Sequence, residues 1–103
     1  MKIIKSQQFK PEKAWDALTI ANMNGITTRL HWANKAYQWH TNTGEEVFVV
    51  LSGAVEMHYR QNGAEASARL DAGDIFFAST GTEHSAQPSP EAHILVIEQE
   101  GSE

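Results

Sequence analysis

Four polar side chains in two stretches of the sequence have the types and spacing of a metal site. His40, Asn42 and Glu46 occupy positions of equal parity, so on extended backbone their side chains point to the same side. His84 follows a glycine-containing turn and begins a second expected strand. Two imidazoles and one carboxylate suit a mononuclear Fe, Mn, Ni, Co or Zn site with positions left for substrate. The amide oxygen of Asn42 is a weaker, fourth candidate ligand.

A pocket beside these side chains is expected from the same strands. Strand alternation continues the parity of His40 and Glu46 into apolar residues, which would form a wall that excludes water. The expected pocket residues are Gln38, Phe48, Val50, Met57 and His58. His58 would serve as an acid or base if its side of the strand lines the cavity, and the alternative is a surface histidine.

The elements that must position these groups are short strands. Glycines recur every 8–10 residues from Gly44 to Gly81, a spacing typical of an all-β sandwich or barrel. Asn24-Gly25 and Asn62-Gly63 predict hairpin turns, and Pro11–Leu18 predicts at most about two turns of helix. The predicted strands are Ala17–Met23, Ile26–Trp32, Tyr37–His40, Glu46–Leu51, Ala54–Arg60, Ala66–Leu70, Ile75–Ala78, His84–Gln87 and Ala92–Gln99.

Length and composition limit the classes of function. A chain of 103 residues with 41% hydrophobic residues predicts one globular domain. It has no cysteine, which excludes disulfides, thiolate metal sites and thiol catalysis. The net charge of −5 argues against a nucleic-acid partner. The longest apolar run, Val47–Leu51, is too short to span a membrane, so no membrane association and a cytoplasmic location are expected.

Two spaced patterns in the chain resemble the motifs of the small single-domain cupins. In the first, His40-x-Asn42 is followed after three residues by Glu46 and after six more by Gly53, with Asn42 where the family has a second histidine. In the second, Gly73 is followed after ten residues by His84. The nearest subgroup is the bacterial cupins loosely labelled mannose-6-phosphate isomerase-like.

The resemblance implies an all-β cupin barrel, also called a double-stranded β-helix or jelly roll. Residues 26–98 would form the barrel, and residues 1–25 a short N-terminal arm and first strand. The family's ligands map onto His40, Glu46 and His84, with Asn42 as a weak or substituted ligand. The family is often dimeric, and Val47–Leu51, apolar on both faces, also favours a homodimer.

Two functions follow as hypotheses. The first is a metalloenzyme in which one divalent transition metal acts as a Lewis acid on a small polar metabolite, by isomerisation, decarboxylation or oxygenation. The second is a non-catalytic module that senses a small ligand in the same pocket, with or without metal. Four large aromatic residues are expected to make core or dimer contacts, and the alternative is that they form a shelf on which a ligand stacks. They are Trp15, Trp32, Tyr37 and Trp39.

Overall fold

A computed structural model describes residues 1–102, and they form an antiparallel β structure, as predicted. The strands in sheet order are β1-β2-β7-β4-β5, with β3 added to β7 and β6 added to β4. In residues 1–102 no helix is long and apolar enough to cross a membrane. The elements are η1 (Ser6–Gln8, a 3₁₀ turn), β1 (Ala17–Met23), β2 (Ile26–Ala33), β3 (His40–Thr41), β4 (Glu46–Gln61), β5 (Ala64–Asp71), β6 (Ile75–Ala78) and β7 (Glu83–Gln99).

The hairpin predictions are confirmed. In both Asn-Gly pairs the two residues have positive φ, at 56° and 85° for Asn24 and Gly25 and at 54° and 77° for Asn62 and Gly63. Positive φ at both central residues is the requirement of the tight turn that best matches strand twist. The turns join β1 to β2 and β4 to β5.

The predicted helix at Pro11–Leu18 is wrong. Trp15 has a φ of 72°, and its backbone N–H donates to the carbonyl oxygen of Trp32 at 2.8 Å instead of to a helical partner. Docking of this segment on β2 therefore outweighs its weak helix propensity. The predicted strand Tyr37–His40 is also largely irregular, because only His40 and Thr41 pair, with β7.

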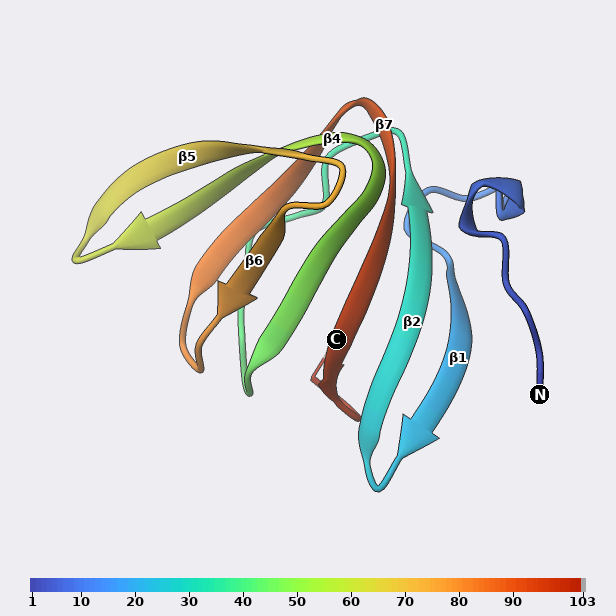
Figure 1. Cartoon of the computed structure of the whole chain (residues 1–103). Helices are drawn as coiled ribbons and strands as arrows, with labels where there is room; N and C mark the ends of the chain where they lie inside the picture. Colours follow the sequence, from blue (N-terminus) through green and yellow to red (C-terminus); the bar gives the residue numbers. More distant parts are fainter. Residues whose placement is uncertain (103) are drawn as a thin grey trace.

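Two long strands that the sequence divided into four form a ribbon that runs through the whole molecule. β4 and β7 pair from Glu46↔Glu98 at one end to Arg60↔Glu83 at the other. The register shifts on both sides of Gly53, which has a φ of 74°. Figure 1 shows both strands curving over at the middle of their length. The ribbon is therefore folded upon itself, which brings its two ends together.

The core lies between the inward faces of this folded ribbon. Alternate residues of β4 and β7 point into it, as strand geometry requires. The buried cluster consists of Phe48, Val50, Val55, Met57, Leu70, Ala86, Ala92, Ile94 and Val96. Polar groups are also buried at the edge of this core, among them Glu46, His84 and Glu98.

The segment before β1 is attached to the outer side of the sheet by specific contacts. His93 Nε2 donates to the carbonyl oxygen of Phe9 at 2.7 Å, and His93 Nδ1 accepts from the Ser52 hydroxyl at 2.8 Å. The side chain of Glu91 accepts a hydrogen bond from Trp32 Nε1 at 2.9 Å and lies 3.8 Å from Lys10 Nζ. These contacts hold Phe9 and Lys10 against the sheet. The same segment continues to Trp15, which lines the cavity described below.

Candidate metal centre and its cavity

Folding of the ribbon brings together Glu46 and His84, which lie towards opposite ends of it, and β3 adds His40 beside them. His40 in β3 is the register partner of His84 in β7, so their rings are neighbours, with centroids 4.2 Å apart. Glu46 begins β4, whereas the β4 partner of His84 is Tyr59. On a straight strand Glu46 and Tyr59 would be about 43 Å apart. Instead, Glu46 Oε1 lies 3.5 Å from His84 Nε2.

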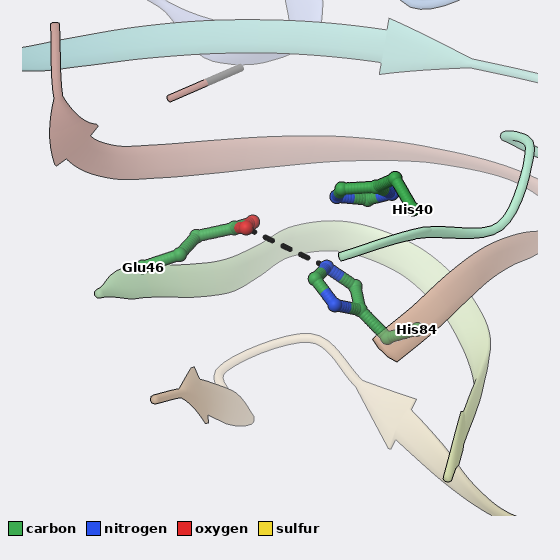
Figure 2. Close-up of side chains that lie close together, drawn as sticks. All are labelled: His40, Glu46 and His84. Carbon is green, nitrogen blue, oxygen red and sulfur yellow. Dashed lines mark ion pairs between the residues drawn. The ribbon is translucent and has the colours of Figure 1, made fainter. Parts of the chain in front are cut away.

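The three side chains converge on one point. One ligand atom from each of His40, Glu46 and His84 lies within 4.8 Å of the other two. Figure 2 shows the two rings and the carboxylate pointing towards one another from three segments. Glu46 and His84 are buried and His40 is half-buried, so the group is shielded from water on most sides.

The hydrogen bonding of His40 leaves one ring nitrogen free to bind a cation. Its Nδ1 donates to the carbonyl oxygen of Gln38 at 3.3 Å, which leaves the lone pair on Nε2. Burial lowers the pKa of His40, and nearby His84 lowers it further, while the bond to Gln38 and the charge of Glu46 oppose the change. His40 is therefore a neutral imidazole at neutral pH, the form that binds metals.

The donor set fits a metal ion. His84 Nδ1 is buried and has no hydrogen-bond partner within residues 1–102, and His84 Nε2 lies 3.5 Å from Glu46 Oε1. At that distance the pair is too long for a good hydrogen bond. Buried polar groups that do not satisfy one another are costly without a further partner. Two imidazoles and one carboxylate are the donors that a divalent transition metal prefers.

Asn42, the fourth candidate ligand, is buried, and both its side chain and its backbone make hydrogen bonds to neighbouring segments. Its Nδ2 donates to the carbonyl oxygen of Ala78 at 3.4 Å. Its backbone N–H donates to Thr82, and its carbonyl oxygen accepts from Gly81. In the described chain Asn42 is not part of the cavity lining. These bonds hold the segment of β3 against the turn that precedes His84.

The predicted pocket residues divide into three groups. Phe48 lines the cavity beside the three candidate ligands. Val50 and Met57 are fully buried in the core. Gln38 has an exposed side chain, and His58 is half-buried opposite Ser67 and Ser85, so in the described chain neither lines the cavity.

The cavity itself is larger than the group of ligands and includes residues that sequence reasoning missed. It has a volume of about 300 Å³. Arg29 and His31 lie at alternate positions of β2, and both line the cavity. In the sequence, polar residues at alternate positions of a strand are typical of a solvent-exposed face, so these two gave no sign of a cavity. Glu98 shares its face with Ile94 and Val96, and this alternation is the sequence signal that could have placed it inside. The lining is Trp15, Asp16, Ala17, Arg29, His31, Tyr37, His40, Glu46, Phe48, His84, Ala86, Val96 and Glu98.

Comparisons with known structures show the same architecture elsewhere. A cupin-2 domain protein from Shewanella frigidimarina is 26% identical, with a TM-score of 0.78, over 90% of this chain and 86% of that chain. A protein with a double-stranded β-helix domain from Klebsiella pneumoniae is 18% identical, with a TM-score of 0.74, over 100% of this chain and 94% of that one. Hydroxypropylphosphonic acid epoxidase from S. wedmorenis is 15% identical, with a TM-score of 0.63, over 72% of this chain and 43% of that chain.

The sequence comparisons give the family. A search of curated proteins finds no match to this chain. The family model described as the cupin domain matches residues 32–97, which include β2 from Trp32 and most of β7. This match covers more than half of the sequence and contains all three converging side chains. The chain therefore belongs to the cupin domain family.

Proposed function

We propose that this cupin binds one divalent transition metal through His40, Glu46 and His84 and acts on a small polar metabolite. The observation that carries the proposal is the convergence of these three buried or half-buried donors, with ligand atoms within 4.8 Å of one another. When bound, the metal would supply Lewis acidity towards carboxylate or vicinal oxygen atoms of the substrate. Three protein ligands leave coordination positions open for those atoms.

The residues of the chain prepare this site in two ways. The hydrogen bond from His40 Nδ1 to the carbonyl oxygen of Gln38 orients the ring and selects its tautomer. The apolar side chains of Phe48, Ala86 and Val96 line the cavity and limit the water around the ligands. A dry cavity strengthens the electrostatic contacts between substrate and site.

Metal loading of single-site variants tests this proposal. Purified protein is stripped of metal, loaded anaerobically with Fe(II), Mn(II), Ni(II), Co(II) or Zn(II), and measured by plasma mass spectrometry. Fe(II) is loaded first, because the structurally similar epoxidase has been crystallised in an Fe(II) form. We expect about one metal per chain in wild type and little in His84→Ala or Glu46→Gln. The control is His58→Ala, which removes a histidine outside the cavity lining.

Turnover distinguishes an enzyme from a ligand sensor. The replacement of the family's second histidine by Asn42, which bonds to Ala78, supports the alternative of a non-catalytic small-ligand-binding module. Loaded protein is screened for oxygen uptake and for isomerisation or decarboxylation of small sugars and acids. Turnover that is lost in Glu46→Gln supports the enzyme. Stoichiometric metal without turnover, together with saturable ligand binding, supports the sensor.

We also propose that two copies of the chain pair through the outer face of the sheet. Phe77 and Ile75 of β6 are 56% and 64% exposed, and they are in register with Val47 and Val49 of β4. Exposed apolar patches of this kind mark association surfaces. Within residues 1–102, the outward positions of β6, β4 and β7 where these strands lie side by side carry no charged side chain, which suits contact with an identical face related by a two-fold axis. The residues are Val47, Val49, Ile75, Phe77, Leu95 and Ile97.

A further inference from the structure

Trp15 is held in an unusual conformation beside the metal cavity. Its φ of 72° lies in the left-handed region, which a bulky residue rarely adopts and which is most often retained where function needs it. Three hydrogen bonds of 2.8 Å fix Trp15. Its backbone N–H donates to the carbonyl oxygen of Trp32, and its Nε1 donates to the carbonyl oxygen of Lys35. Its own carbonyl oxygen accepts from His31 Nδ1. The indole ring is therefore presented to the cavity in a single orientation.

Trp15 is the outer member of a run of rings that ends at the candidate metal ligands. The centroid of Trp15 lies 5.3 Å from that of Tyr37, and Tyr37 lies 5.3 Å from His40, both in edge-to-face contact. Tyr37 is also fixed, because its N–H donates to Ala86 O at 2.9 Å and its carbonyl oxygen accepts from Ser85 Oγ at 2.7 Å. We call Trp15 and Tyr37 together the aromatic wall.

The remaining lining sets the size and character of a ligand. Part of it is apolar, made by Phe48, Ala86 and Val96, and part is polar, made by Asp16, Arg29, His31 and Glu98. The cavity volume of about 300 Å³ is at the lower end for small-molecule sites. On the apolar side of the cavity, a ligand bound at the metal centre therefore contacts rings and apolar groups, and aromatic rings gain more than their buried area in such contacts.

We propose that the ligand of this site carries an aromatic ring, which packs on Trp15 and Tyr37, and two adjacent oxygen atoms directed to the metal centre. The proposal rests on the metal site proposed above and narrows its substrate class from small polar metabolites to small aromatic chelators. Trp15 and Tyr37 act in it as specificity-determining residues, because they contact the ring and not the metal.

Two hydroxamates provide the test, since they chelate a metal through the same atoms. Co(II)-loaded protein is titrated with benzohydroxamate and with acetohydroxamate, and the visible spectrum of Co(II) is followed. Each affinity is divided by that of the same hydroxamate for free Co(II). We expect benzohydroxamate to bind at least about tenfold more tightly than acetohydroxamate after this correction.

Variants assign this preference to the wall. In Trp15→Leu the preference should fall to about twofold or less, while the affinity for acetohydroxamate stays within about twofold of wild type. Tyr37→Leu provides a second variant if Trp15→Leu does not fold. The matched control is Trp39→Leu, because within the described chain Trp39 does not line the cavity. Its ring lies under the guanidinium of Arg60, with 4.1 Å between the ring centroid and Arg60 Cζ.

The possible failures are distinguishable. Protein that binds neither Co(II) nor any of the other four metals overturns the metal site and this proposal together. Bound Co(II) with equal corrected affinities for the two hydroxamates overturns the aromatic ligand alone. A preference in wild type that persists in both Trp15→Leu and Tyr37→Leu also overturns it, because the ring would then bind elsewhere.

Discussion

Substitution of Gly53 by alanine is expected to disrupt the bend that assembles the candidate metal site. Gly53 lies in β4 where the ribbon folds over, with a φ of 74°. A Cβ atom there would lie 2.0 Å from the carbonyl oxygen of Glu91 and 3.1 Å from Ala92 Cα. These are backbone atoms of the paired strand, so the clash is relieved only if the two strands separate.

The magnitude is the sum of two terms. Placing an L-residue in the left-handed region costs roughly 1–2 kcal/mol. Forcing an extra atom into a closely packed site costs about 1–3 kcal/mol more. The expected loss for Gly53→Ala is therefore about 2–5 kcal/mol. For a chain of this length, with a free energy of unfolding of about 5–15 kcal/mol, that is a large fraction of the total.

Gly63 provides the matched control, because it isolates the backbone term. Its φ of 77° is close to that of Gly53, but among residues 1–102 no heavy atom beyond Gly63 and its two chain neighbours lies within 4 Å of the position of an added Cβ. Urea denaturation followed by circular dichroism should give a loss of about 1–2 kcal/mol for Gly63→Ala. Metal affinity should fall in Gly53→Ala only. Equal losses in the two variants would refute the argument that close approach to Glu91 holds the bend.

Three further predictions concern protonation, the role of Asn42 and assembly. Because burial lowers the pKa of His40 in the folded state, the folded chain binds fewer protons than the unfolded chain. The free energy of unfolding of metal-free protein should therefore fall as pH drops through about 6.5, and this fall should be less steep in His40→Gln. Urea denaturation from pH 8 to 5 measures both. Asn42→Ala should cost about 1 kcal/mol of stability through loss of its bond to Ala78 but leave metal affinity within about threefold, whereas a loss of affinity as large as that of His84→Ala would show that Asn42 is a ligand. In light scattering at micromolar concentration, wild type should have the mass of two chains and Phe77→Glu the mass of one, whereas a monomeric wild type would remove the dimer.

Local signals were sufficient to predict much of the fold. Asn-Gly pairs specify their turns through backbone conformation alone, and both turns are present. Alternation correctly placed Phe48 and Val50 on the inward face of β4. His40, Glu46 and His84, which were expected together from their types and spacing, lie close together despite the turn between His40 and Glu46.

Non-local contacts explain what the sequence did not show. Pro11–Leu18 has a helical start signal, but hydrogen bonds from Trp15 to Trp32 and Lys35 fix its middle as a bend and turn that lead into β1. The continuity of β4 through Gly53 depends on its pairing with Ala92, almost forty residues away. Arg29 and Glu98 enter the cavity only because β2 and β7 pair in a particular register. The register between strands that are distant in the chain cannot be read from the residues that flank each position.

The most direct test of the metal centre is an anomalous-difference map of Zn(II)-loaded crystals at the zinc edge. We expect one strong peak, with His40 and His84 nitrogen atoms and a Glu46 oxygen atom about 2.0–2.2 Å away. The peak should be absent in crystals of His84→Ala. No peak among these three side chains in loaded wild-type crystals, or a peak bound only by other residues, would contradict the proposed metal centre.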